Sequence, residues 1–254
     1  MNVPPVTLRR VFWRCLFLQA AWNRRGMQNL GFAYAIAPAL RRLYADPGQR
    51  SDALRRHLAT FNCHPYTAAA IVGGAIHHEE RVAAGEEPAG APLEYKQVLQ
   101  GPLAAVGDGF FWAGLRPFFG ALAAVGTLLL GWPALVAALL LYNGVHIWLR
   151  WTLFRAGYRS GDGVVLRLAS LSLPAWAARL RDGGAVLAGV GAGILALVAT
   201  GRLGLAAGAV TMAAAAAGVV ALWLRARLLP TAYVALALGT AAGILAVRFP
   251  GGRW

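Results

Sequence analysis

Apolar residues in this chain form runs separated by polar clusters, and the first run repeats at helical spacing. Between Thr7 and Trp22 they recur every three or four positions, which predicts an amphipathic helix capped by Thr7. Trp22–Leu40 begins polar and then stays apolar for about fourteen residues, short of the roughly 20 that span a bilayer, so we expect a half-span or a buried helix. Arg41–His57 predicts two charged cytoplasmic helices separated by the turn sequence Asp46-Pro47-Gly48.

The first of these helices has two possible surroundings. Arg10 and Arg14, with phenylalanine and tryptophan beside them, suit a helix that lies in the membrane interface. A helix packed against a partner subunit has the same pattern. The sequence alone leaves both open.

Phe61–Glu80 consists of a polar cluster, a proline and then a helix of small apolar residues. Gly73 and Gly74 leave room for another backbone to pack closely, as membrane helices prefer. The helix ends in a run of two histidines and two glutamates, His77, His78, Glu79 and Glu80. Ligands three apart on a helix can bind a metal, but a solvated helix end explains the same run. Arg81–Glu94 follows as an exposed loop.

The stretch Gly101–Pro117 is rich in glycine, bounded by prolines, and almost wholly apolar apart from two charges. Asp108 and Arg116 must either pair or face a water-filled cavity, because an isolated ion in hydrocarbon is costly. Glycine permits tight turns and proline interrupts helical hydrogen bonding. We therefore predict a broken helix or a re-entrant loop at membrane depth.

The rest of the chain is mostly apolar. The run after Pro117 divides at Gly131-Trp132-Pro133, and beyond that break Asn143, His146 and Arg150 share one helical face, with His146 expected to be a packed residue. Trp151–Asp182 is arginine-rich and predicts a cytoplasmic loop with a boundary helix. Three runs of near-spanning length follow: Gly183–Thr200, Leu203–Leu224 and Thr231–Val247. The fold class expected is thus all-α, a polytopic membrane protein with short broken or re-entrant helices in its N-terminal two thirds and about three spanning helices at its C-terminus.

Composition supports the membrane class. Hydrophobic residues make up 58% of the chain and charged residues 13%, with a mean hydropathy of +0.54. The net charge of +14 comes from 23 arginines and one lysine, Lys96, against 10 acidic residues. Because these arginines lie in the N-terminal segment and between apolar runs, they favour anionic lipid as a partner rather than nucleic acid.

Soluble-type chemistry has little support in the sequence. It contains no Walker loop, GxSxG elbow or HExxH, so we expect no catalytic residue, cofactor or metal. Cys15 and Cys63 match neither a disulfide framework nor a CxxC metal motif. Arginines interrupt the first apolar patch, and no cleaved signal peptide is expected.

The polar clusters at helix ends suit recognition of a hydroxylated solute. Asp108 can accept hydrogen bonds from sugar hydroxyls, Trp112 can stack on a sugar face, and Arg116 can hold Asp108 or meet a phosphate. Gln28 and Asn29 can also bind hydroxyls, although Asn29 suits a helix cap equally well. The structural alternative is that Asp108 caps a helix starting near Gly109 and pairs with Arg116.

Three stretches together resemble one known family: VFWRCLFLQAAWNRRGMQNLGFAYAIAPALRRLY, then FNCHPYTAAAIVGGAIHHEER, then GPLAAVGDGFFWAGLRP. In this order and spacing they resemble the IID subunit of the mannose/fructose/sorbose family of the bacterial sugar phosphotransferase system (PTS). The resemblance covers about residues 7–160. It suggests a family core in residues 1–160 and a hydrophobic tail in residues 161–254.

The resemblance implies a non-catalytic membrane subunit of an enzyme II complex. With a homologous IIC subunit the chain would translocate a hexose-type sugar, while IIA and IIB phosphocarrier proteins phosphorylate it, in multimers of IIC/IID pairs. It implies a multi-pass protein of the bacterial inner (cytoplasmic) membrane with a cytoplasmic N-terminus. The substrate or translocation residues it implies are Gln28, Asn29, Asn62, His64, Pro65, Asp108, Trp112 and Arg116.

Two departures from the family pattern leave an alternative open. Cys63 stands where a threonine is common and Gly109 where a serine is common, so two hydroxyls are missing and no sugar preference follows. A transport-inactive binding or regulatory protein that keeps the IID fold is the alternative function. If Asn62, His64 and Asp108 share one polar site, Asn62 or His64 must lie near the Asp108 segment in the fold.

Overall fold

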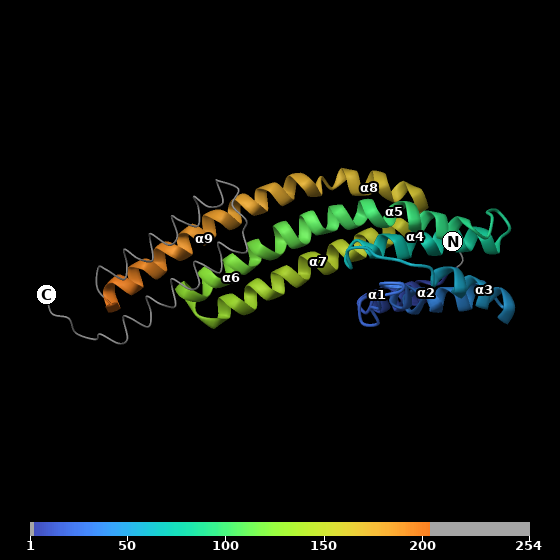
Figure 1. The fold of residues 1–254 in the computed structure, drawn as a ribbon, viewed down its shortest axis with the longest axis horizontal. Helices are drawn as coiled ribbons and strands as arrows, with labels where there is room; N and C mark the ends of the chain where they lie inside the picture. The colour runs from blue at the N-terminus through green and yellow to red at the C-terminus, as the bar shows by residue number, and fades with distance from the viewer. Residues whose placement is uncertain (1–2, 204–254) are drawn as a thin grey trace. The chain divides into compact units, whose positions relative to one another are not determined.

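The structure is a computed structural model that describes residues 3–203, and within that range it is helical with no strand. Figure 1 shows the order of the elements. The α-helices are α1 (Pro5–Cys15), α2 (Asn29–Leu43), α3 (Pro47–His57), α4 (Ala68–Ala83), α5 (Ala91–Gly107), α6 (Arg116–Leu130), α7 (Trp132–Ser160), α8 (Val164–Ser170) and α9 (Leu173–Leu203). The predicted spans Leu203–Leu224 and Thr231–Val247 lie outside the described residues.

The chain forms two compact units. The first consists of Met1–Pro117 and Leu139–Arg181, and the second of Phe118–Ala138 and Asp182–Trp254. The predicted boundary at residue 160 is a different kind of division, because it separates the stretch that resembles the family from the hydrophobic tail. It stays a prediction.

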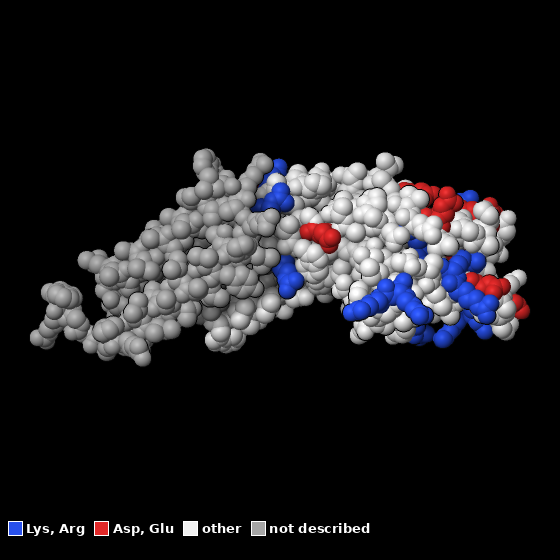
Figure 2. All heavy atoms as spheres, in the orientation of Figure 1, with Lys and Arg blue, Asp and Glu red and all other residues white. Residues whose placement is uncertain are grey.

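The core of the first unit is built from the apolar faces of α1, α2, α4 and α7. Phe12 of α1, Ile36 of α2, Ile71 of α4 and Phe154 of α7 belong to one buried cluster. Helices α1, α2 and α4 have one apolar face, whereas α7 is apolar on most of its surface, and burial of this apolar area drives the helices together. Lys96 and Arg150 are buried, but most basic side chains of the described residues remain on the surface, and Figure 2 shows several of them gathered over the part of this face that α1 to α3 occupy.

Helices α4 and α7 cross with their backbones in contact. A Cβ atom at Gly73 would collide with the carbonyl oxygen of Phe154, and one at Gly157 would collide with that of Ala70. The close packing predicted for the small residues of α4 is therefore confirmed, and α7 is the helix that uses it.

The first helix is shorter than predicted. It starts at Pro5, and Thr7 is buried within it and does not cap it. Proline at the first helical position already has the right φ and lacks only an N–H that would be unpaired, which explains this start. The helix ends at Cys15, and turns follow up to Trp22, where the expected helix should still continue.

The predicted break in Gly101–Pro117 is wrong. The chain is helical without interruption from Ala91 to Leu130, because a π-helical segment, Asp108–Leu115, joins α5 to α6. The N–H of Arg116 bonds to the carbonyl of Phe111, five residues back. Proline has no N–H to donate, and its ring crowds the preceding helical turn. The wider π-helical turn leaves room for the ring, so Pro117 is tolerated without a break.

The described part of the second unit contains the turn between α6 and α7. Gly131 has φ +75°, in the left-handed region that favours glycine, and the helices end and begin on either side of it. The division predicted at Gly131-Trp132-Pro133 is thus confirmed. Gly183 and Gly191 of α9 face Phe118 and Val125 of α6, where small residues allow close packing.

By length and composition, two stretches are helical and apolar enough to cross a membrane: Ala91–Leu130, which is continuous, and Trp132–Val198, which runs through α7, α8 and most of α9. In the arginine-rich region Trp151–Asp182, α7 continues to Ser160 and the short helix α8 follows. This region is therefore more helical than the expected loop.

Candidate functional site

A turn at residues 61–67 forms the base of the candidate site. Gln28 clamps it: its side-chain amide donates to the carbonyl of Cys63 at 2.8 Å and accepts from the Cys63 N–H at 3.1 Å. The backbone N–H of Gln28 also donates to the Phe61 carbonyl at 2.8 Å. Gln28 is 2% exposed, so these bonds form away from water and fix the turn on the start of α2.

Asn29 also serves the local structure. Its amide donates to the Leu58 carbonyl at 2.7 Å and accepts from the Asn23 side chain at 3.0 Å. Both of its polar atoms are thus engaged, and Asn29 joins the start of α2 to the end of α3. Direct contact of Gln28 or Asn29 with a sugar stays a prediction.

Arg150 of α7 holds the other side of the turn. Its guanidinium donates to the Pro65 carbonyl at 2.6 Å and lies 4.9 Å over the Tyr66 ring. Arg150 is 3% exposed, and no ion pair joins it to an acid among residues 3–203. A buried cation without a carboxylate is costly, so carbonyl and aromatic contacts must stabilise it here. Sequence reasoning left it out of the site, although its place on one face with His146 was a usable signal.

His64 joins the turn to the π-helical segment. Its ring stacks on Phe111 with 5.0 Å between centroids and lies edge-on to Trp112 at 4.8 Å. A Cβ at Gly107 would collide with the His64 side chain, so the glycine is needed for this approach. The predicted proximity of His64 to the Asp108 segment is therefore confirmed.

The ionisation of His64 follows from its surroundings. Burial, with the nearby charge of Arg150 adding to it, lowers the pKa of His64 to about 4. The ring is thus neutral at pH 7, and its Nδ1 accepts from the Tyr66 N–H at 3.2 Å. Nε2 is buried and has no hydrogen-bond partner in the described part of the chain.

We expect the neutral His64 ring to make the fold sensitive to acid. The pKa of His64 in the folded protein, about 4, lies below the ordinary 6.5. The stability that the neutral ring contributes is therefore complete above pH 6.5 and is lost as the pH falls towards 4. Between pH 7.5 and pH 5 the wild type should lose about 2 kcal/mol more stability than His64→Phe, which keeps the aromatic stack. Denaturant unfolding at the two pH values measures this. Equal losses in the two proteins would contradict it.

Asp108, Trp112 and Arg116 lie on the segment that His64 contacts, and all three are exposed. The Arg116 guanidinium lies 5.1 Å from the Trp112 ring centroid. Asp108 and Arg116 are separated along the helix axis by on the order of 10 Å. No ion pair joins them among the described residues, so the alternative in which Asp108 caps a new helix and pairs with Arg116 is wrong.

Two further predicted positions border this segment. The backbone N–H of Asn62 donates to the Gln100 side chain at 3.0 Å, while the Asn62 side chain is exposed. His146 stacks on Tyr66 at 4.3 Å, and its Nε2 contacts the Asn143 amide oxygen at 3.0 Å. His146 is thus a packed residue, as predicted. Exposed Asp108, Trp112 and Arg116 lie on the helical segment that contacts the ring of His64, and exposed Asn62 is two residues from His64 in the turn. Polar and aromatic groups of this kind suit binding of a hydroxylated ring.

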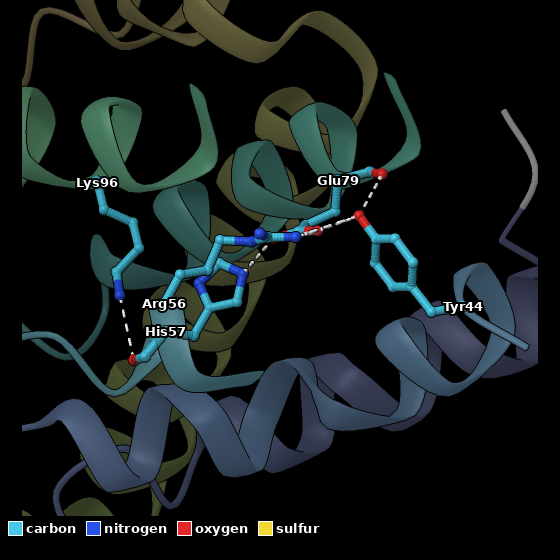
Figure 3. A network of polar contacts seen from close by, with 5 residues as sticks. All are labelled: Tyr44, Arg56, His57, Glu79 and Lys96. Atoms are coloured by element: carbon cyan, nitrogen blue, oxygen red, sulfur yellow. Dashed lines mark hydrogen bonds and ion pairs between the residues drawn. The ribbon is translucent and has the colours of Figure 1, made fainter. Parts of the chain in front are cut away.

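A buried polar network, shown in Figure 3, joins the end of α2 to α3, α4 and α5 within the first unit. Glu79 of α4 accepts from Arg56 at 2.7 Å, from His57 at 2.8 Å and from the Tyr44 hydroxyl at 2.7 Å. The side chain of Glu79 is fully buried. Lys96, 1% exposed, donates to the His57 carbonyl at 3.2 Å and lies 4.2 Å over the Phe32 ring.

The charges in this network are set by its contacts. Burial raises the pKa of Glu79, but hydrogen bonds from His57 and Arg56 outweigh it and bring the value to about 2. Burial lowers the pKa of His57, so a neutral ring donates from Nε2 to the carboxylate. The prediction of a solvated helix end is wrong for Glu79, because α2 and α3 fold over that end of α4.

The other members of the His-His-Glu-Glu run point to separate partners. His77 contacts the Tyr158 carbonyl at 3.1 Å and His78 contacts Glu87 at 2.8 Å. Glu80 accepts from the Tyr158 hydroxyl at 2.7 Å and from the Val3 N–H at 2.8 Å. No group of three such ligands converges anywhere in the described residues. Cys15 and Cys63 are buried and free, and burial raises the pKa of each thiol to about 12.

These features define a class: an all-helical membrane protein with a polar and aromatic cluster where a turn meets an irregular helix. Solved structures agree with this class. The chain resembles the mannose transporter ManYZ in its cryo-EM complex with microcin E492, with a TM-score of 0.61 and 34% identity over 75% of this chain and 70% of that one. It also resembles a structure described as a membrane protein, with a TM-score of 0.66 and 34% identity over 76% and 71%.

Residues 3–198 match the PTS system mannose/fructose/sorbose family IID component, and the chain belongs to that family. It is 42% identical over 163 residues to the mannose-specific EIID component of Escherichia coli K12, covering 62% of this chain and 56% of that protein. It is 32% identical over 181 residues to the fructose permease IID component of Bacillus subtilis 168, covering 70% and 63%. The chain therefore spans little more than half the length of the curated relatives it matches.

Proposed function

We propose that this chain is the IID membrane subunit of a PTS sugar permease and that it translocates a hexose-type sugar together with a IIC subunit. The observation that carries the proposal is the contact of His64 with Gly107, Phe111 and Trp112. It brings two separate family motifs into one site in a chain of this family. IIA and IIB proteins would phosphorylate the sugar, so this subunit itself carries out no phosphoryl transfer.

The roles follow from burial. Asp108, Trp112, Arg116 and Asn62 are exposed, so they would contact the sugar through hydrogen bonds and stacking. His64 and Pro65 are buried, and with Gln28 and Asn29 they would position the turn. The protein would act in the bacterial inner membrane with its N-terminus in the cytoplasm, in multimers of IIC/IID pairs.

Asp108→Asn is expected to reduce sugar uptake roughly 10- to 100-fold, because a hydrogen bond to a charged group is worth about 1.5–3 kcal/mol. The measurement is phosphoenolpyruvate-dependent uptake in cells that carry this chain with its IIC, IIA and IIB proteins. Asp52→Asn is the matched control, since Asp52 is an exposed acid whose Arg55 partner is also exposed, and it should leave uptake within about twofold.

Immunoblots of the membrane fraction must show equal amounts of each variant. Uptake that survives both Asp108→Asn and deletion of the chain would refute the proposal. A chain that co-purifies with a IIC subunit without saturable sugar binding by the pair would instead favour the transport-inactive alternative.

A further inference from the structure

Two neighbouring hollows on the first unit form an arginine-rimmed groove. The larger, about 430 Å³, lies between α1 and α7, with an apolar floor that includes Leu8, Trp151 and Phe154. The smaller, about 300 Å³, shares Trp151, Arg155 and Arg159 with it and adds Arg167 of α8. Volumes of this size suit a bound small molecule.

The groove carries positive charge without compensation. Arg9, Arg155, Arg159 and Arg167 are all exposed on its rim, and no acidic residue lines either hollow. No ion pair within residues 3–203 involves these four side chains. Arg155 and Arg159 are one helical turn apart, where like charges repel. An anion bound between them would relieve that repulsion.

The apolar floor narrows the choice of anion. Phe154 is 1% exposed and belongs to the core, while Leu8 and Trp151 are half-buried beside it. A free phosphate would bind the arginines but leave the apolar floor exposed to water. A molecule with a phosphate and an acyl chain would cover both, since apolar area is stabilised by leaving water.

We propose that this groove binds an anionic phospholipid of the membrane, with its phosphate between Arg155, Arg159 and Arg167 and an acyl chain along Leu8, Trp151 and Phe154. The site lies on residues outside the proposed sugar site and goes beyond the proposed function. Basic pockets beside membrane helices commonly recognise lipid headgroups in this way.

The test titrates the purified full-length chain in neutral detergent with phosphatidylglycerol, phosphatidylcholine and glycerol 1-phosphate. Native mass spectrometry counts bound lipid, and thermal unfolding measures the apparent affinity. Phosphatidylglycerol should bind saturably and raise the melting temperature. The double variant Arg155→Gln/Arg159→Gln should weaken binding about 10- to 30-fold. The double variant Arg155→Lys/Arg159→Lys, which keeps both positive charges, should retain most of the wild-type affinity.

Arg24→Gln/Arg25→Gln is the charge-matched control, because both arginines are exposed and line neither hollow. It should change the affinity less than twofold. Equal affinity for phosphatidylcholine would overturn the proposal, as would equal affinity for glycerol 1-phosphate, which would indicate a soluble phosphate site. Loss of lipid binding when the IIC subunit is added would also overturn it and would identify the groove as a subunit interface.

Discussion

Glu79→Gln is expected to lower the free energy of unfolding by about 3–5 kcal/mol, because it leaves a largely buried guanidinium without its counter-ion. The side chains of Glu79 and His57 are fully buried and that of Arg56 is 15% exposed. Glutamine can still accept a hydrogen bond, but it carries no charge to offset Arg56. Denaturant unfolding in detergent, followed by tryptophan fluorescence, measures the change.

Glu86→Gln is the control for this substitution. Glu86 also faces an arginine, Arg81, but the two side chains are 59% and 46% exposed. Water screens such a pair, so its loss should change stability by less than about 1 kcal/mol. If Glu79→Gln were as mild as Glu86→Gln, the network of Figure 3 would not stabilise the fold.

Gly157→Ala is expected to destabilise the protein by about 2–3 kcal/mol, the cost of overpacking a tight interface. The added methyl would meet the carbonyl oxygen of Ala70 and the backbone nitrogen of Gly74, neither of which can rotate away. Because the turn leads directly into α4 and Glu79 lies on α4, separation of α4 from α7 should also reduce sugar uptake. The same unfolding assay and the uptake assay measure both effects.

Gly144→Ala in the same helix is the matched control. Nothing lies within 4 Å of a Cβ built at Gly144. Alanine there should be neutral or stabilise the helix by up to about 1 kcal/mol, because it restricts the unfolded chain. The two substitutions are therefore expected to differ in sign. A stabilising Gly157→Ala would show that the helices are not in backbone contact.

Several features were predictable because they depend on nearby residues alone. The break between α2 and α3 was predicted at Asp46-Pro47-Gly48, and it lies between Leu43 and Pro47, where Asp46 caps α3 by accepting from the Gln49 N–H at 2.7 Å. The turn at Gly131 needs a residue that tolerates positive φ, and the sequence has a glycine there. The proximity of His64 to the Asp108 segment is not local, and it was inferred instead from two polar clusters that each lie beside a short apolar helix.

Other features could not be predicted because they depend on distant parts of the chain. Gly101–Pro117 has the composition of a broken helix, yet it stays helical through a π-helical segment before Pro117. His64 and Thr67, which are distant in sequence, pack on Gly107 next to that segment. Glu79 follows two histidines at a helix end and resembles a solvated residue. Arg56 and His57, more than 20 residues away in sequence, decide that it is buried.

Hydrophobic periodicity and composition were sufficient for the helical class, the membrane environment and the main turns, because these depend on short-range sterics and total apolar area. The family was inferred from the resemblance of three sequence stretches in their order and spacing. The partners of each polar side chain were decided by tertiary structure. A buried charge is stable only with a counter-charge or dipole beside it, and which one is available depends on how the helices cross. Arg150 on the Pro65 carbonyl and Glu79 between Arg56 and His57 show this dependence directly.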